Sequence, residues 1–160
     1  MRIAFVASQG GHSGQIGIIF TPRVIGKNYS IFVTENPKVK SSFEMKEKEF
    51  HKKWRTYLFR KDYLSLYPWR YIEAIINLRK IFKKEKIECV VTNGAQISIP
   101  ACIAAKMLGI KTIFLDTVIR VKTPNWSARA CYYFSDKFLV QHSSMAAKYG
   151  KKARYEGGIL

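Results

Sequence analysis

Acidic residues are scarce in this chain of 160 residues, where 11 Asp and Glu stand against 28 Lys and Arg and the formal net charge is +17. Such an excess indicates an anionic partner: a nucleic acid, acidic lipid headgroups or a phosphorylated substrate. No recognised nucleic-acid-binding motif accompanies the charge, so a nucleic acid is the least favoured of the three partners.

Long apolar runs, secretory signals and metal-binding patterns are also lacking. No run approaches the ~20 residues that cross a bilayer, and the N-terminus leads directly into a strand pattern instead of a signal peptide. We therefore expect any membrane contact to be peripheral or made through a partner. Cys89, Cys102 and Cys131 are widely spaced in apolar stretches, which predicts buried, reduced thiols in a cytosolic compartment and no metal site. No cofactor is expected.

Apolar residues make up 48% of the chain, enough for a core, and they follow two alternating patterns. Short buried-strand patterns and helical patterns alternate along the chain, and residues 43–61 are predicted to be partly helical. The strands are expected at 3–7, 30–34, 89–92, 111–115, 137–141 and 153–155, and the helices at 14–25, 69–84, 97–108, 124–134 and 143–149. This order predicts an α/β fold in a single domain, 1–160, with a Rossmann-like parallel sheet and helices on both faces.

Gly10, Gly11 and His12 directly follow the first strand pattern. Glycines allow a tight turn and a close approach of the backbone to a ligand. The N–H groups of a helix that starts there attract phosphate, and His12 can hold or release a proton near neutral pH. The alternative is an ordinary glycine turn whose histidine caps a helix. Other polar motifs follow later strands, so we expect them at the same edge of the sheet: Asn93-Gly94, Asp116 with Arg120, and Gln141-His142.

Six motifs in one order resemble a known family. They are Gly10-Gly11-His12, Thr92–Ala95 with Pro100, Leu108–Lys111, Asp116–Pro124, Tyr133–Gln141 and Tyr155–Gly158. The family comprises asparagine-linked glycosylation protein fourteen and its PssD-type bacterial capsule and exopolysaccharide counterparts. The same Gly-Gly-His pattern is similar to the N-terminal half of the peptidoglycan N-acetylglucosaminyltransferase.

The resemblance implies half of an enzyme, equivalent to the N-terminal, acceptor-binding domain of a GT-B glycosyltransferase. A separate donor-binding subunit would bind a nucleotide sugar, expected to be a UDP-sugar. The heterodimer would transfer the sugar to a polyprenyl-diphosphate-linked sugar at the cytoplasmic face of the cell membrane, in polysaccharide or lipid-linked oligosaccharide biosynthesis. The chain alone would be inactive. The rival hypothesis is a non-catalytic membrane adaptor that recruits a glycosyltransferase.

Under this hypothesis His12 and Asp116 are the candidate bases that take the proton of the acceptor hydroxyl. The acceptor diphosphate would meet Gly10, Gly11, Asn93, Gly94, Arg120 and Lys122. Alternatively, Asp116 orients a neighbour or closes its loop onto Arg120, and Asn93-Gly94 forms only a turn. The partner interface is assigned to Gln141, His142, Tyr155, Gly157 and Gly158, although Gln141 also suits a helix cap.

Basic and aromatic residues are interleaved in residues 46–86, which hold 13 basic and 5 acidic side chains. This mixture is typical of contact with an anionic membrane surface. The membrane contacts are predicted to include Trp54, Arg55, Tyr57, Trp69 and Arg70. The same mixture suits single-stranded nucleic acid, through stacking and phosphate contacts, or a solvated helix face that covers the sheet.

Overall fold

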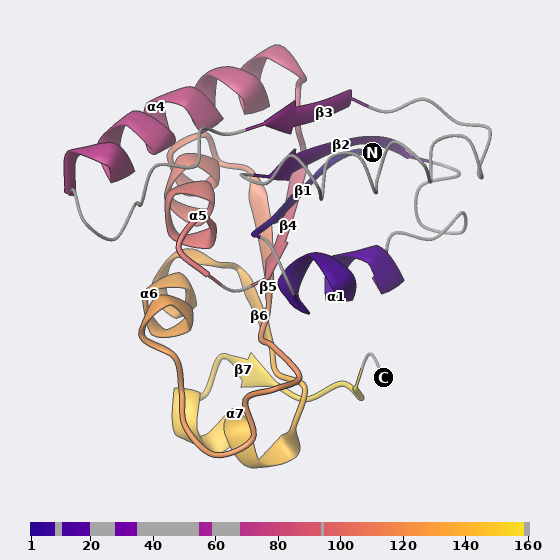
Figure 1. Cartoon of the computed structure of the whole chain (residues 1–160), viewed down its shortest axis with the longest axis vertical. Coiled ribbons are helices and arrows are strands. Elements are labelled where there is room, and N and C mark those ends of the chain that lie inside the picture. Colours follow the sequence, from indigo (N-terminus) through magenta and orange to yellow (C-terminus); the bar gives the residue numbers. More distant parts are fainter. Residues whose placement is uncertain (9–10, 20–27, 35–54, 59–67, 94, 159–160) are drawn as a thin grey trace.

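A computed structural model describes residues 1–8, 11–19, 28–34, 55–58, 68–93 and 95–158. These residues form a parallel sheet of seven strands in the order β3-β2-β1-β4-β5-β6-β7 (Figure 1). The strands are β1 (Arg2–Ala7), β2 (Tyr29–Thr34), β3 (Arg55–Leu58), β4 (Cys89–Asn93), β5 (Lys111–Leu115), β6 (Lys137–Leu139) and β7 (Ala153–Arg154). The helices are α1 (Gly11–Ile19), α4 (Pro68–Lys84), α5 (Ser98–Met107), α6 (Trp126–Phe134) and α7 (Ser143–Tyr149). The Rossmann-like α/β fold predicted from the sequence is confirmed.

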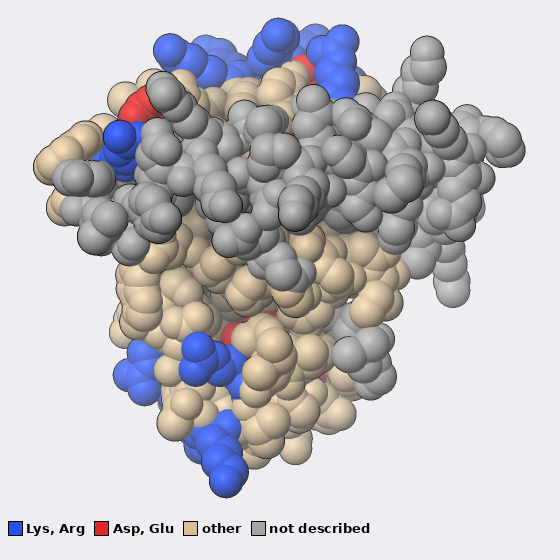
Figure 2. Space-filling view, viewed as in Figure 1, with Lys and Arg blue, Asp and Glu red and all other residues tan. Residues whose placement is uncertain are grey.

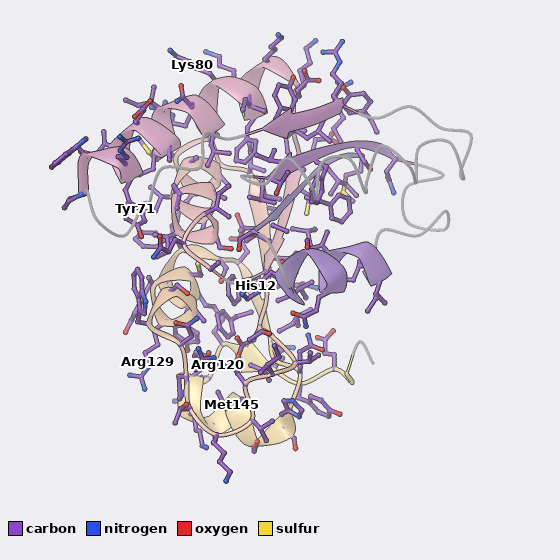
Figure 3. The ribbon with its side chains drawn as sticks, viewed as in Figure 1. His12, Tyr71, Lys80, Arg120, Arg129 and Met145 are labelled. Atoms are coloured by element: carbon purple, nitrogen blue, oxygen red, sulfur yellow. The ribbon has the colours of Figure 1, made fainter. Side chains whose placement is uncertain are left out.

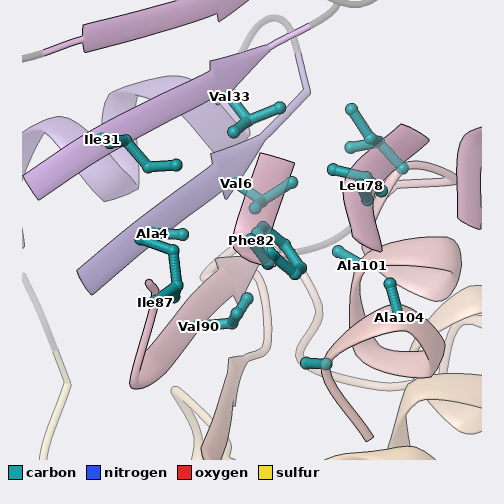
Figure 4. Packing of buried hydrophobic residues seen from close by; sticks show 12 residues of the cluster. Ala4, Val6, Ile31, Val33, Leu78, Phe82, Ile87, Val90, Ala101 and Ala104 are labelled. Atoms are coloured by element: carbon teal, nitrogen blue, oxygen red, sulfur yellow. The ribbon is translucent and has the colours of Figure 1, made fainter. Parts of the chain in front are cut away.

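The pleat of β1 sends alternate side chains to opposite faces of the sheet, as strand geometry requires. Ile3, Phe5 and Ala7 join a core that includes Ile16 of α1. Residues Ala4 and Val6 join the opposite core, where α4 and α5 cover the sheet (Figure 4). The buried residues of α4 are Ala74, Leu78 and Phe82, which have helical spacing, and Leu78 and Phe82 belong to this core. Helices therefore pack against both faces of the sheet, as predicted.

A third core joins α5, α6 and α7 to β5 and β6. Its aromatic centre is the stacked pair Phe114 and Phe138, whose ring centroids lie 4.8 Å apart. Cys102 and Cys131 belong to it, and all three cysteines of the chain are free and buried, as predicted. A hydrogen bond with Cys102, together with burial, raises the pKa of the Cys131 thiol, which therefore stays protonated at neutral pH.

Several element boundaries differ from the predicted ones. Strand β3 lies within residues 43–61, where partly helical structure was predicted; this was wrong for 55–58, which pair with β2. Helix α1 starts at Gly11 instead of residue 14, and the predicted helix residues 20–25 lie outside the described residues. Helix α6 starts at Trp126 because Asn125 caps it, its side-chain oxygen accepting a hydrogen bond from the Ser127 amide.

Glu85 joins the first three strands at their N-terminal ends. Its carboxylate accepts hydrogen bonds from the hydroxyl of Tyr29 (2.6 Å), from the guanidinium of Arg55 (2.8 Å) and from the hydroxyl of Tyr57. The side chain of Arg2 donates to the Glu85 carbonyl at 2.6 Å. Burial by itself raises the pKa of Glu85, but the three side-chain hydrogen bonds and the positive charge of Arg55 outweigh it and lower the pKa to about 2. This network explains how the short edge strand β3 is held.

No helix among the described residues combines the length and apolar character needed to cross a membrane.

Candidate functional site

The polar motifs of the sequence meet at the C-terminal edge of the sheet. Strand β1 pairs with β2 on one side and with β4 on the other, so the strand order reverses between β1 and β4. Ligands of open α/β sheets bind outside the C-terminal ends of the strands at this kind of reversal. Helix α1 follows β1 here, and the loop of residues 117–125, which we term the pocket loop, follows β5 nearby.

A pocket of about 460 Å³ lies between the start of α1 and the pocket loop. Its volume falls in the range of about 300–1,000 Å³ that is usual for small-ligand sites. The lining residues are His12, Thr117, Ile119, Arg120, Val121, Lys122, Thr123 and Asn125. In Figure 3, His12 lies at the start of α1 and Arg120 lies on the neighbouring loop. The predicted site residues His12, Arg120 and Lys122 are thus brought together, although His12 is far from the other two in the sequence.

His12 is the titratable group whose environment fits proton transfer in this pocket. Its ring is half-buried, and Nδ1 is buried with no hydrogen-bond partner among the described residues. Burial first, and then the positive charge of Arg120, lower the pKa of His12 below 6.5. The imidazole is therefore neutral at pH 7 and able to accept a proton.

Asn93 forms a hydrogen bond with the backbone of His12. The Asn93 side chain is fully buried at the end of β4, and its amide nitrogen donates to the His12 carbonyl (2.7 Å) and to the Gln15 side-chain oxygen (3.3 Å). Within the described residues, the other amide atoms of the pair, Asn93 Oδ1 and Gln15 Nε2, have no hydrogen-bond partner. Gln15 was missed at the sequence level. The available signal was a single amide side chain directly before the apolar residues at the end of α1.

Asp116 lies beneath the pocket loop and does not line the pocket. Its side chain is 2% exposed, its backbone amide donates to the Leu139 carbonyl (2.8 Å), and its Oδ1 accepts from the Thr117 amide (2.9 Å). Burial raises the pKa of Asp116, although the Thr117 amide and the Tyr149 hydroxyl oppose the shift. This placement suits the alternative in which Asp116 orients its surroundings.

The predicted glycine contacts are only partly described, because Gly10 and Gly94 lie outside the described residues. Gly11 opens α1 opposite the exposed Ile119 of the pocket loop. A Cβ built on Gly11 would meet Ile119 Cδ1 at 3.6 Å, an ordinary van der Waals contact. Packing within the described chain therefore does not require glycine at position 11.

The residues assigned to a partner interface lie in two different environments. Gln141 is 6% exposed, so its side chain faces the interior. His142 is half-buried and its Nε2 lies 2.6 Å from the Val118 carbonyl oxygen, the distance of a hydrogen bond that the ring donates. Tyr155, Gly157 and Gly158 are exposed on the final segment after β7. Of the five residues, only Tyr155, Gly157 and Gly158 are exposed enough to contact a partner directly.

The residues assigned to membrane contact also lie in different surroundings. Trp54 lies outside the described residues, and the polar ends of Arg55 and Tyr57 bind Glu85. Trp69 is 61% exposed at the start of α4, and Arg70 beside it is half-buried. The exposure of Trp69 thus suits the predicted contact, whereas the polar ends of Arg55 and Tyr57 are held by Glu85.

Among the residues that the structure describes, no three His, Cys, Asp or Glu side chains cluster closely enough to hold a metal ion. The chemistry available at the pocket is that of a neutral imidazole, two cationic side chains and the N-terminus of a helix.

Residues 4–160 match the family described as "Oligosaccharide biosynthesis protein Alg14 like". The mouse "UDP-N-acetylglucosamine transferase subunit ALG14" is 24% identical over 187 residues, covering 100% of this chain and 83% of the mouse protein. The human protein of the same name is 30% identical over 86 residues, covering 50% of this chain and 39% of the human protein.

A cyanobacterial enzyme of Synechocystis is 36% identical over 64 residues, or 39% of this chain and 18% of that enzyme. It is the "UDP-N-acetylglucosamine--N-acetylmuramyl-(pentapeptide) pyrophosphoryl-undecaprenol N-acetylglucosamine transferase".

Among solved structures, Acinetobacter baumannii MurG has a TM-score of 0.71 at 12% identity, with 89% of this chain and 42% of that chain covered. A Methanocaldococcus jannaschii UDP-GlcNAc 2-epimerase has a TM-score of 0.75 at 12% identity, with 99% and 47% covered. The chain thus spans under half the length of these solved structures, which share its fold.

Proposed function

This chain belongs to the Alg14-like family of oligosaccharide biosynthesis proteins, and from that premise we propose that it is the acceptor-binding subunit of a two-component, inverting glycosyltransferase. A second subunit supplies the UDP-sugar, and the acceptor is a sugar linked to a polyprenyl diphosphate. The observation that carries the proposal is the pocket in which His12, at the start of α1, lies together with Arg120 and Lys122. Two relatives support the proposal by their names. The mouse relative is named as a transferase subunit, and the cyanobacterial relative is named as a transferase that acts on a pyrophosphoryl-undecaprenol sugar.

The diphosphate of the acceptor binds at the mouth of this pocket. The first turn of α1 brings backbone N–H groups and the positive end of the helix dipole to this mouth. Arg120 and Lys122 are both exposed on the pocket loop and add two positive charges, and a guanidinium can bind phosphate through two hydrogen bonds. Gly10, Gly11 and Gly94 belong to this site by prediction.

His12 serves as the general base. In the reaction, the acceptor hydroxyl oxygen bonds to the anomeric carbon of the donor sugar, and the bond from that carbon to the nucleotide diphosphate breaks. His12 takes the hydroxyl proton, which its lowered pKa allows because the ring is neutral before the step. Asp116, buried below the loop, orients the residues around it and stays away from the reacting atoms.

The donor subunit completes the site. The solved structures with this fold are more than twice as long as the part that this chain covers, and a donor domain from a second protein would supply the corresponding half. The test is to recover tagged chain from its native membrane extract and to identify the proteins that co-purify. We expect a protein with a nucleotide-sugar-binding domain. Only the pair should transfer sugar from UDP-N-acetylglucosamine to a polyprenyl-diphosphate-linked sugar. Transfer by the purified chain alone, or repeated recovery of the chain with RNA, would contradict the proposal.

Helix α4 attaches the subunit peripherally to the cytoplasmic face of the membrane. Three exposed apolar side chains share one stripe of α4: Trp69 (61% exposed), Ile72 (61%) and Ile76 (46%). The same stripe continues into the exposed lysines Lys80 and Lys83. Figure 2 shows Lys and Arg side chains at the top, where Figure 1 places α4, and others on the lower part of the same face. Lys80 points away from the fold in Figure 3. Apolar and aromatic side chains beside lysines are typical of helices that lie on anionic bilayers.

Replacing Trp69 and Ile72 together with serine should weaken binding to vesicles that contain about 30% phosphatidylglycerol by roughly tenfold or more, because two apolar side chains leave the lipid. Vesicle flotation measures the bound fraction. Met107→Ser removes a similarly exposed apolar side chain from the end of α5 and should leave binding unchanged. Equal binding by all three proteins would place the membrane contact elsewhere.

A further inference from the structure

Four side chains at α7 hold the main chain of the pocket loop. The His142 ring donates to the Val118 carbonyl (2.6 Å), and the Ser144 hydroxyl donates to the Val121 carbonyl (3.2 Å). The ammonium group of Lys148 donates to the Lys122 carbonyl, and the Tyr149 hydroxyl accepts from the Asn125 amide (3.3 Å). These contacts occur along the loop that supplies every lining residue of the pocket except His12.

His142 is the best placed of these four side chains. Ser144 and Lys148 are exposed to solvent, whereas His142 and Tyr149 are half-buried, which strengthens their hydrogen bonds. Of these two, His142 makes the shorter bond, 2.6 Å to the Val118 carbonyl against 3.3 Å between the Tyr149 hydroxyl and the Asn125 amide. Val118, its acceptor, lies two residues before Arg120. Helix α7 is itself held in the core by the fully buried Met145 (Figure 3), so His142 extends from a rigid support.

The loop has little support of its own. The Arg120 amide donates to the Thr117 carbonyl (3.2 Å), and all five residues from 119 to 123 are exposed. Segments with few buried contacts and few backbone hydrogen bonds open at low cost in free energy.

We propose that His142 is a positioning residue: by holding the Val118 carbonyl it fixes the pocket loop in the conformation that presents Arg120 and Lys122 to an anionic ligand. The identity of that ligand as a diphosphate rests on the proposed function, whereas the loop contact does not. His142 thereby acts inside the subunit, in place of the partner contact predicted for it from the sequence.

The test compares His142→Ala with His142→Gln, whose amide nitrogen can donate to the same carbonyl. Hydrogen exchange of the backbone amides of residues 117–125 reports on the loop, and calorimetric titration with inorganic diphosphate reports on the pocket. For His142→Ala we expect faster exchange in the loop, unchanged exchange in β1 and β4, and about fivefold weaker diphosphate binding, as the loss of one hydrogen bond implies. His142→Gln should restore much of both signals.

Ser143→Ala is the matched control, because Ser143 is the exposed neighbour of His142 on the same turn. It should leave exchange and binding unchanged. Loop exchange that is unaltered in His142→Ala would overturn the positioning role, as would a folded His142→Gln variant that behaves like His142→Ala. If the wild-type chain does not bind diphosphate, the proposed function fails, and the exchange data still decide whether His142 holds the loop.

Discussion

Replacing His12 with alanine should lower turnover by the assembled two-subunit enzyme by about 10²–10⁴-fold, the contribution typical of a general base. The expectation follows from the position of the ring in the pocket and from its lowered pKa, which keeps it neutral and ready to accept a proton. Initial rates of sugar transfer at saturating donor, together with a pull-down of the donor subunit, measure the effect. Binding of the partner should persist, because the partner interface is predicted on the final exposed segment and His12 lies at the pocket.

The variant His12→Gln separates two roles for the same side chain. Glutamine retains a hydrogen-bond donor for a phosphate but cannot take up a proton at neutral pH. If His12 is the base, the Gln and Ala variants lose turnover equally; if it only binds phosphate, Gln restores most of it. Turnover that is unchanged in both variants would favour the non-catalytic adaptor over a catalytic subunit.

The pH profile of the wild-type enzyme offers a further check on His12. A base works only when it is unprotonated, and burial and Arg120 lower the pKa of this ring below 6.5. The acidic limb of the pH profile of kcat/KM reports the pKa of the base in the enzyme without bound substrate. The midpoint of this limb should therefore lie below pH 6.5. A limb above this pH that persists in His12→Gln would assign the titrating group elsewhere.

Replacing Glu85 with glutamine should destabilise the fold by about 2–3 kcal/mol at pH 7, because three charge-assisted hydrogen bonds become neutral or are lost. This free-energy change allows for the solvent exposure of Arg55, which screens the ion pair between Arg55 and Glu85. For a chain of this size the melting temperature should fall by roughly 5–10 °C. Differential scanning calorimetry measures the change, and Glu73→Gln, which removes an exposed carboxylate of α4, is the control of equal charge.

The same network makes the free energy of unfolding of the wild-type protein depend on pH in the acidic range. The pKa of Glu85 is about 2 in the folded protein against an ordinary 4.5, so the unfolded chain takes up the proton first as the pH falls. The stabilisation is fully present above about pH 4.5 and is lost progressively towards pH 2. In Glu85→Gln this contribution is absent, and unfolding free energy should vary less with pH across that window. An unchanged acid profile would show that the Glu85 hydrogen bonds do not stabilise the ionised form.

Local sequence patterns were sufficient for most of the elements. The apolar and helical spacings predicted β1, β5, α4 and α7 closely, because each pattern reports on one element and one buried face. Strand β3 was missed because its residues are charged and aromatic as much as apolar, and its partners are Glu85 and β2, which lie far away in the sequence. Tertiary contact overrides weak local preference in such short edge strands.

The candidate site shows the same division. The rule that ligands bind at the C-terminal ends of parallel strands was enough to predict from the sequence that His12, Asn93 and Arg120 share one edge. It did not predict what each side chain does there. Asn93 binds the His12 carbonyl from 81 residues away in the sequence, and His142 holds the pocket loop from 24 residues away.

Local periodicity and residue type were enough to establish the alternation of strands and helices, the reduced and buried cysteines, and the ordered motifs that identify the family. The three-dimensional arrangement was needed to establish that Asp116 is buried beneath the loop, that His12 faces Arg120 and Lys122 in one pocket, and that His142 turns inward. The reason is that strand order and register set the distances between residues remote in sequence, and no local pattern encodes them.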